Sequence, residues 1–289
     1  PGGAARASPR RHGMNLVVQG PSLTLRQVEA LGNMTEASGL ARLGASAFRL
    51  ADARNVPDVA IYCAAEQIDF GFVAPDAGLA DFRLVALDMD STLITIECID
   101  ELGALAGKKD EVAGITAAAM RGEMAFAESL RRRVELLAGL SDRALKRVYE
   151  ERLQLTEGAE QLLARLKVLG TRTLLVSGGF TYFTERLKKR LAFDRATSNR
   201  LEIARRRLTG RLKGDIFDAA GKATVVREER EKMALDRAQV LVIGDGANDL
   251  PMMAEAGISI AYRAKPLVRE RATYCLNHVG LDGVLNLFP

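Results

Sequence analysis

Four short, very apolar runs along the chain each end in small, acidic or polar residues. They begin at Leu84, Arg172, Val240 and Ile258 and read "LVALDMD", "RTLLVSGG", "VLVIGDG" and "ISIAY". Helical segments separate them, and strands that are apolar on both faces and alternate with helices indicate a parallel sheet covered on both sides. Ligands of such sheets bind beyond the carboxyl ends of the strands. The sequence therefore predicts an α/β fold with a doubly wound parallel sheet and a site at those ends.

One interval, from Glu97 to about Leu155, breaks this alternation because it contains no convincing strand. It reads instead as successive amphipathic helices. An all-helical insertion directly after the first acidic strand end predicts a cap over the site. A helical subdomain elsewhere on the surface is the alternative, but the short connection from Asp90 to Glu97 favours the cap.

The residues before the first apolar run form a smaller unit. Residues 14–81 alternate strand-like and helical stretches in the order β-α-β-α-β, and the stretch 24–44 is mostly helical in its spacing. The unit has no paired acids, phosphate loop or metal-ligand cluster, which favours a docking or dimerisation module over a ligand-sensing one. Residues 75–81 read as a linker, so we expect a second domain over 82–289. Residues 1–13 are rich in Arg, Gly and Pro and predict a disordered leader, with a transit peptide left open.

The scarcity of some residue types narrows the chemistry. Of the two histidines, His12 lies in the leader, which leaves only His278 as material for a histidine general base. The three cysteines are widely spaced without a CxxC pair, which argues against zinc and a disulfide framework and for a reducing, cytoplasmic compartment. No apolar run reaches the roughly 18 residues of a membrane span. The Arg-rich runs lack the interleaved aromatic residues expected for nucleic-acid binding.

The first apolar run ends in two acids, Asp88 and Asp90, followed by Ser91 and Thr92. In an extended chain residues i and i+2 point the same way, so the two carboxylates could share one side of the strand end. Carboxylates this close repel each other unless a cation or a proton separates them. Mg²⁺ fits, because it takes one or two carboxylates together with water and phosphate. A helix-capping aspartate is the simpler interpretation, but it explains one acid and not two.

Two further segments place polar residues at strand ends. "VLVIGDGANDLPM" ends its apolar run at Asp245, with Asn248 and Asp249 just beyond, which suits metal coordination by Asp245 better than a plain turn. "TLLVSGGF" offers the hydroxyl of Ser177 and free backbone amides such as that of Gly178. A hydroxyl and amides at a helix N-terminus can hold a phosphate oxygen.

Lys222 adds a positive charge to this set if it lies near the same strand ends, and otherwise it is an ordinary surface lysine. The chain then offers several acids, one lysine, one serine and no useful histidine. Aspartate is a covalent nucleophile in phosphoryl transfer. Such catalysis relies on positioning and on charge neutralisation by Mg²⁺, lysine and backbone amides. The residues therefore point to phosphoryl transfer.

The motifs "DMDST", "VSGGF", Lys222 and "GDGANDLPM", in this order, resemble the haloacid dehalogenase-like phosphatases. The intervening text, including "STLITIECIDE" and "LTGRLKGDIFDA", is similar to the bacterial members of that family that hydrolyse O-phospho-L-serine. The resemblance covers about Leu84 to the C-terminus and implies a Rossmann-like core with a helical cap inserted at about 97–155. Residues 14–81 resemble the ACT-like N-terminal extension of some bacterial members.

The roles of the family's residues carry over to matching positions. The resemblance implies that Asp88 is the nucleophile that becomes an aspartyl-phosphate, and that Asp90 protonates the leaving oxygen and then activates water. It implies a Mg²⁺ site made by Asp88, the backbone carbonyl of Asp90, and Asp245. The residues that would hold or support the phosphate are Ser177, Gly178, Lys222, Asn248 and Asp249.

Substrate selection would fall to the cap. Glu97 matches the family residue that meets the substrate ammonium group, and Arg133 matches the one that meets its carboxylate. This pairing makes physical sense, because a zwitterionic amino acid needs one anion and one bidentate cation. Met120 and Phe126 would line the pocket, and the two arginines before Arg133 would lie on the surface.

The resemblance implies a Mg²⁺-dependent phosphatase that releases L-serine from O-phospho-L-serine, the last step of L-serine biosynthesis. The alternative is the same machinery acting on another small phosphomonoester, such as phosphohomoserine, or passing phosphate to an alcohol. A non-catalytic amino-acid-binding regulator is disfavoured because the chain keeps every motif residue. The expected partner is the small-molecule substrate, without nucleic acid or membrane, and a homodimer is left open.

Overall fold

The computed structural model describes residues 13–120 and 123–289, apart from the side chain of Met120. The described residues divide into two compact units, one of residues 13–79 with 282–289 and the other of residues 80–120 with 123–281. The predicted boundary after Asp81 lies two residues from this division. Residues 282–289 belong to the first unit, which the sequence did not indicate. Almost all of the predicted leader, residues 1–13, lies outside the described residues. Throughout the part of the chain that the structure describes, every helix is too short or too polar to cross a lipid bilayer.

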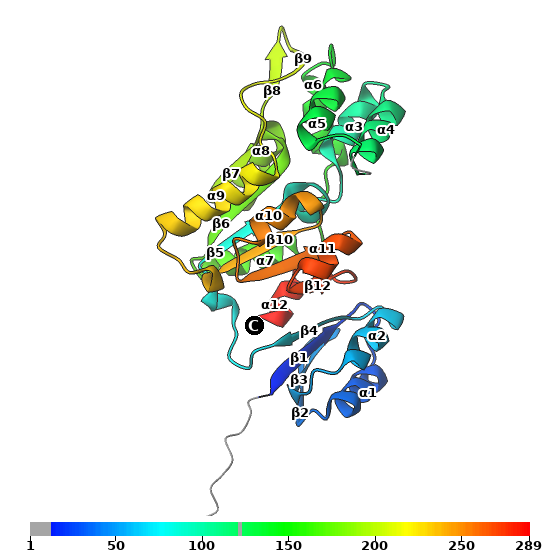
Figure 1. The fold of residues 1–289 in the computed structure, drawn as a ribbon, viewed down its shortest axis with the longest axis vertical. Helices are drawn as coiled ribbons and strands as arrows, with labels where there is room; N and C mark the ends of the chain where they lie inside the picture. The colour runs from blue at the N-terminus through cyan, green and yellow to red at the C-terminus, as the bar shows by residue number, and fades with distance from the viewer. Residues whose placement is uncertain (1–12, 121–122) are drawn as a thin grey trace, which may run out of the picture. The chain divides into compact units, whose positions relative to one another are not determined.

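The first unit is a four-stranded antiparallel sheet with strand order β2-β3-β1-β4 (Figure 1). Alternate strand residues such as Leu16 and Leu50 are buried in one apolar cluster with residues of the two long helices, including Val28 and Val59. The period of two along the strands therefore supplies one face of this core. The elements are β1 Met14–Gln19, α1 Leu25–Thr35, β2 Gly39–Gly44, β3 Ala47–Ala53, α2 Pro57–Ala65, β4 Asp69–Val73 and α12 Gly283–Leu287.

The predicted β-α-β-α-β order of this unit is wrong at one point, because residues 24–44 are not one helix. Helix α1 ends at Thr35, Glu36 takes a left-handed conformation with φ 52°, and the chain then forms β2. Strand β2 lies at the edge of the sheet and is exposed along most of its length, so it lacks the alternation that identifies a half-buried strand. The observed order is β-α-β-β-α-β, the ferredoxin-like arrangement, and the closer ACT-like comparison stays a prediction.

The second unit contains the predicted doubly wound parallel sheet. Its strand order is β12-β11-β10-β5-β6-β7, and all five ladders are parallel. The chain starts in the middle at β5, runs outward to β7, and returns to the other side at β10. The order therefore reverses between β5 and β10, which is where ligands bind in such sheets. The strands are β5 Leu84–Leu87, β6 Arg172–Phe180, β7 Arg195–Asn199, β10 Val240–Gly244, β11 Ile258–Tyr262 and β12 Tyr274–Leu276.

Burial on both faces explains why the central strands are apolar at every position. All residues of β5 and β10 are buried. One face packs against α9, α10 and α11 in a cluster that includes Val226, Met252 and Val268 (Figure 1). The helices of this core are α7 Ala159–Val168, α8 Thr181–Leu191, α9 Ala219–Lys232, α10 Leu250–Met253 and α11 Pro266–Arg271, with short turns η1 Leu79–Asp81, η4 Arg237–Gln239 and η5 Ala247–Asp249.

The predicted helical insertion follows β5. It consists of helices and helical turns with the bounds α3 Cys98–Leu105, α4 Lys109–Met120, α5 Phe126–Glu135, α6 Arg143–Arg147 and η3 Val148–Arg152. Helix α5 is strongly amphipathic and buries Ser129, Leu130 and Val134. The two ends of the insertion lie next to each other. The amide of Thr156, after the insertion, donates to the carbonyl of Leu93, before it, at 3.0 Å.

A β-hairpin that the sequence did not connect with the cap packs against it. Strands β8 Leu201–Ala204 and β9 Arg207–Leu212 pair with each other and stand apart from the main sheet (Figure 1). Leu208 of the hairpin is buried, its carbonyl accepts from Gly139 at 2.9 Å, and its amide donates to Leu140 at 2.8 Å. The cap is therefore built from two insertions far apart in the chain.

Candidate active site

Asp88 lies directly beyond the carboxyl end of β5, where the buried strand stops. Its backbone amide continues the ladder by donating to the carbonyl of Ile243 at 3.0 Å. The residue as a whole is 5 % exposed. Oδ1 accepts from the amide of Met89 at 2.7 Å and lies 2.9 Å from Nζ of Lys222. The carboxylate is therefore held at a fixed point at the switch in strand order.

Asp90 has extended backbone angles, with φ −64° and ψ 135°, and lies in a turn made by residues 89–93. The chain changes direction at Ser91, which takes φ 57°. Asp90 Oδ1 accepts from the amide of Cys98, the first residue of α3, at 2.9 Å, and Oδ2 lies 3.5 Å from Oγ of Ser177. The side chain thus links the first cap helix to the end of β6.

Three carboxylates gather at the ends of β5 and β10. Oxygens of Asp88, Asp245 and Asp249 all lie within 4.8 Å of one another. Asp249 is fully buried, and its Oδ2 accepts from the amides of Asp245 at 3.1 Å and Gly246 at 3.0 Å. Its Oδ1 accepts from Lys222 at 2.7 Å. Asp249 is therefore a central member of the cluster, and the sequence assigned it only a supporting role.

Within the described residues, the acids of this cluster outnumber the cations that bond to them. Burial, and then the nearby Asp249 carboxylate, raise the pKa of Asp245 from 3.8 to about 7. Burial, and then the Asp249 charge, also raise the pKa of Asp88 well above its ordinary value, although Lys222 opposes this. Burial would lower the pKa of Lys222, but the charges of Asp249 and Asp88 outweigh it and raise that pKa. One lysine among three acids leaves a surplus of negative charge that a divalent cation bound to their oxygens would neutralise.

Thr92 also belongs to the site, although the sequence did not mark it as a partner of Asp245. It is fully buried, and its Oγ1 donates to Oδ1 of Asp245 at 2.9 Å. Its carbonyl accepts from Oγ1 of Thr156 at 2.7 Å. Thr92 therefore fixes the orientation of the Asp245 carboxylate. The one feature of the sequence that could have indicated this role is the position of Thr92 within the polar segment after β5.

The end of β6 forms a small bulge on the other side of Asp90. Ser177 is fully buried, and its Oγ accepts from the amide of Gly179 at 2.9 Å. A Cβ on Gly179 would lie 2.5 Å from Oδ2 of Asp90, so any larger residue here would force the Asp90 side chain to shift. Gly178 and Gly179 belong to the strand, and α8 begins two residues later at Thr181. The predicted amides thus lie in a strand bulge just before the start of helix α8, in line with the prediction that they precede a helix.

Burial and a neighbouring charge change the acidity of Asp90. Burial, and then the charge of Glu97, raise the pKa of Asp90 from 3.8 to about 7, although its hydrogen bond from Cys98 opposes the rise. A group with a pKa near the working pH can both give and take a proton. This pKa is consistent with the proton-transfer role that the family resemblance implies for Asp90.

The cap brings two oppositely charged residues toward Asp90. Glu97 Oε1 accepts from Oγ of Ser91 at 2.8 Å, and burial raises the pKa of Glu97. Burial lowers the pKa of Arg133, while the charges of Asp100, Glu97 and Asp90 act against this. The guanidinium thus lies within electrostatic reach of Glu97 and of Asp90.

The remaining predicted residues are placed as follows. The ring of Phe126 lies over the β6 bulge, 3.3 Å from where a Cβ on Gly178 would stand. The two arginines before Arg133 are exposed, while Arg133 is half-buried, as predicted. Asn248 is half-buried in the turn that carries Asp249, with Oδ1 close over Gly246. The prediction for the Met120 side chain lies outside the described residues.

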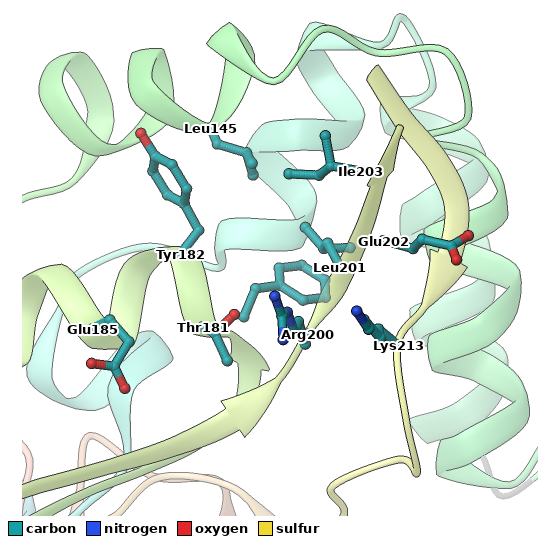
Figure 2. A pocket seen from close by; sticks show the side chains of 10 residues that line it. Leu145, Thr181, Tyr182, Glu185, Arg200, Leu201, Glu202, Ile203 and Lys213 are labelled. Carbon is teal, nitrogen blue, oxygen red and sulfur yellow. The ribbon is translucent and has the colours of Figure 1, made fainter. Parts of the chain in front are cut away.

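A pocket in the second unit does not coincide with these strand ends. Figure 2 shows a pocket of about 570 Å³ between α6, the start of α8 and β8. Its lining residues include Leu145, Tyr182, Arg200 and Lys213 and none of the predicted site residues. The carboxylate of Glu202 points away from it and accepts from Oγ1 of Thr209 at 2.7 Å. The predicted site residues and this pocket are therefore separate features of the second unit.

Comparison with known proteins agrees with the geometry at the strand ends. Residues 85–254 match the model of the haloacid dehalogenase-like hydrolases. This range contains the acidic cluster, Lys222 and the β6 bulge. The chain belongs to the haloacid dehalogenase-like hydrolase family.

Individual relatives cover more of the chain. A phosphoserine phosphatase of Polaromonas sp. (strain JS666) is 50% identical over 218 residues, which are 74% of this chain and 92% of the relative. The crystal structure of a probable phosphoserine phosphatase from Vibrio cholerae superposes with a TM-score of 0.83 at 35% identity, covering 98% of this chain and 88% of that one. A substrate-bound phosphoserine phosphatase complex has a TM-score of 0.66 at 35% identity and covers 72% of this chain and 99% of that one.

Proposed function

We propose that this chain is a Mg²⁺-dependent phosphatase that hydrolyses O-phospho-L-serine to L-serine and phosphate. The observation that supports the proposal is the meeting of Asp88, Asp245, Asp249 and Lys222 at the strand ends. The charges of Glu97 and Arg133 lie within electrostatic reach of Asp90. The relatives at about half identity are phosphoserine phosphatases, which supports the same substrate.

The chain's own residues supply the phosphoryl transfer. Asp88 attacks the phosphorus through a carboxylate oxygen that is fixed by the amide of Met89. The bond from phosphorus to the serine oxygen breaks, and Asp90 gives its proton to that oxygen as the alcohol leaves. Lys222, 2.9 Å from Asp88, neutralises charge on the phosphoryl oxygens. The result is an acyl phosphate on Asp88.

Hydrolysis of this aspartyl-phosphate reverses the role of Asp90. Having lost its proton to the first product, Asp90 takes one from a water molecule that attacks the phosphorus. The bond between phosphorus and the Asp88 oxygen breaks, and the original carboxylate returns. A pKa of about 7 allows Asp90 to act in both half-reactions near neutral pH.

The acidic cluster fits a bound Mg²⁺. The carboxylates of Asp88 and Asp245 would hold the ion, with the backbone carbonyl of Asp90 as the third protein ligand, as in the family's pattern. Asp249 would support them through its bonds to the Asp245 amide and to Lys222. When bound, Mg²⁺ neutralises charge on the carboxylates and on the transferring phosphoryl group.

The cap residues match the two charges of the amino acid. Glu97 would receive the substrate ammonium group, and Arg133 would bind the carboxylate with its two-pronged guanidinium. The phosphate would sit at the amides of the β6 bulge and at the hydroxyl of Ser177, with Phe126 covering Gly178. The two ends of the substrate are thus recognised by different parts of the unit.

A panel of phosphomonoesters with and without Mg²⁺ tests the proposal. We expect Mg²⁺-dependent phosphate release, with kcat/KM highest for O-phospho-L-serine. Equal or higher values for phosphohomoserine or for phosphates without an amino acid would refute the substrate assignment while leaving the phosphatase activity intact. Binding of L-serine without turnover of any ester would favour a regulator. A relation of residues 14–81 to ACT domains, a homodimer and a cytoplasmic location stay predictions.

A further inference from the structure

Asn199, the last residue of β7, joins two segments of the site through its side-chain amide. The residue is 2 % exposed. Its Nδ2 donates to the carbonyl of Gly178 and to the carbonyl of Phe217, each at 2.9 Å. Its Oδ1 accepts from the amide of Phe217 at 2.7 Å. Both amide hydrogens and the oxygen are therefore used in the buried interior.

The first of these bonds compensates for an interruption in the ladder between β6 and β7. Strand β6 pairs with β7 at Val176 and Thr197 and next at Phe180 and Asn199. Three residues of β6, 177–179, thus stand against one residue of β7, and they leave the regular ladder as a bulge. The bulge also removes the ladder partner of the Gly178 carbonyl. Asn199 replaces that partner, which fixes the orientation of the peptide that follows Gly178.

The other two bonds fix the start of α9. Phe217 comes just before Asp218, whose Oδ1 accepts from the amide of Gly221 and caps the helix at 3.0 Å. The ring of Phe217 lies against Gly221, where an added Cβ would be 2.7 Å from a ring carbon. Lys222 follows at once, and its backbone amide donates to the carbonyl of Asp218. The position of Phe217 therefore helps to set where Lys222 enters the acidic cluster.

We propose that Asn199 is a positioning residue for phosphoryl transfer, because it holds the β6 bulge and the Lys222 helix in register around one phosphate. The side-chain bonds of Asn199 run to Gly178 and Phe217 and not to the acids of the cluster. It acts through the Gly178 peptide on one side and through Phe217 on the other. The inference rests on the proposed phosphoryl transfer at Asp88 and does not depend on which alcohol leaves.

The substitution Asn199→Asp tests the hydrogen bonds of the side chain without changing its size. It keeps the size of the side chain and an oxygen that can accept from the Phe217 amide. It replaces the amide nitrogen by an oxygen that faces the carbonyl oxygens of Gly178 and Phe217. Both hydrogen bonds to these carbonyls are lost, and the oxygens repel each other. Asn199→Ala removes all three bonds. Thr171→Val is a matched control, since Thr171 is 5 % exposed and donates to the carbonyl of Phe82 at 3.0 Å, before the start of β6.

The test uses the full chain with saturating Mg²⁺ and p-nitrophenyl phosphate as a generic substrate, with rates normalised to folded protein by circular dichroism. Because misplacement of reacting groups by about 1 Å costs roughly 100-fold, we expect kcat to fall about 10- to 100-fold in both Asn199 variants. Inhibition by orthovanadate, a phosphate analogue, should weaken by roughly the same factor. The Mg²⁺ concentration for half activation should stay within about two-fold, since the metal ligands are unchanged.

Thr171→Val should lower thermal stability and leave kcat within about two-fold of the unaltered chain. The proposal is overturned if both Asn199 variants keep normal kcat and vanadate inhibition per folded molecule. It is also overturned if Thr171→Val loses as much activity, or if the Asn199 variants do not fold, because the residue would then serve the fold alone. Lack of any phosphatase activity in the unaltered chain would reject the proposed function and this inference together, whereas normal turnover with unaffected variants rejects this inference alone.

Discussion

Asp245→Asn should make the metal-free protein more stable at alkaline pH, although it removes a proposed metal ligand. The Asp245 carboxylate lies in a cluster with Asp88 and Asp249. An asparagine keeps the oxygen that accepts from Thr92, so the local hydrogen bond can be retained. What it removes is one negative charge from a buried group of three.

The magnitude follows from the pKa of Asp245, which burial and then Asp249 raise from 3.8 to about 7. The folded state therefore keeps a proton that the unfolded chain has already released between about pH 4 and pH 7. Folding stability falls as pH rises through this window and stays low above it. At about 1.4 kcal/mol for each pKa unit, the penalty at pH 8 is about 4 kcal/mol at most. The substitution should recover a large part of it at pH 8 and almost none at pH 4.

Thermal unfolding in EDTA at pH 8 and at the lowest pH where the protein stays folded measures the effect. A gain of this size corresponds to a rise of roughly 5–15 °C in the unfolding temperature for a unit of this length. Mg²⁺ should stabilise the unaltered protein at pH 8 and stabilise the variant much less. Asp215→Asn, at an exposed position, should change stability by less than about 0.5 kcal/mol. A variant that is less stable than the unaltered chain at pH 8, or a gain that is the same at both pH values, would refute the electrostatic reasoning.

Three further substitutions test the site. Asp88→Asn should lower turnover by at least about 1,000-fold while circular dichroism shows an intact fold, and normal activity would reject the covalent mechanism. Arg133→Ala should raise KM for O-phospho-L-serine about 10- to 100-fold and change the Mg²⁺ requirement little; an unchanged KM would show that the guanidinium does not bind the substrate. Gly179→Ala should lower kcat at least about 10-fold, because its Cβ would lie 2.5 Å from Asp90 Oδ2. The control for it is Gly114→Ala on the exposed side of α4, with open space around its Cβ, which should stay fully active.

The sequence was most informative where both faces of an element are buried. The strands β5 and β10 are apolar at every position because helices cover both sides of the sheet, so their ends could be located to within a residue or two. The residues after those ends, including Asp88 and Asp245, stood out because polar groups there interrupt a buried pattern. The structure brings these two together with Lys222.

Elements with exposed surfaces were harder to recognise. Strand β2 is an edge strand with little burial, so its sequence carries no alternation and was assigned to the preceding helix. Helix α12 has five residues and joins the N-terminal unit, a long-range association that no local pattern encodes. The packing of the β8–β9 hairpin on the cap depends likewise on contacts between distant segments, such as the bonds of Leu208.

The sequence by itself determined the class of the fold, the order of the motifs and the set of reactive groups, because those follow from residue type and from local periodicity. Only the tertiary structure decided which groups act on one another. It placed Asp249 inside the acidic cluster, Thr92 on Asp245, and Asn199 between the β6 bulge and α9. These are contacts across long stretches of chain, and their strength depends on burial and distance, which exist only once the chain has folded.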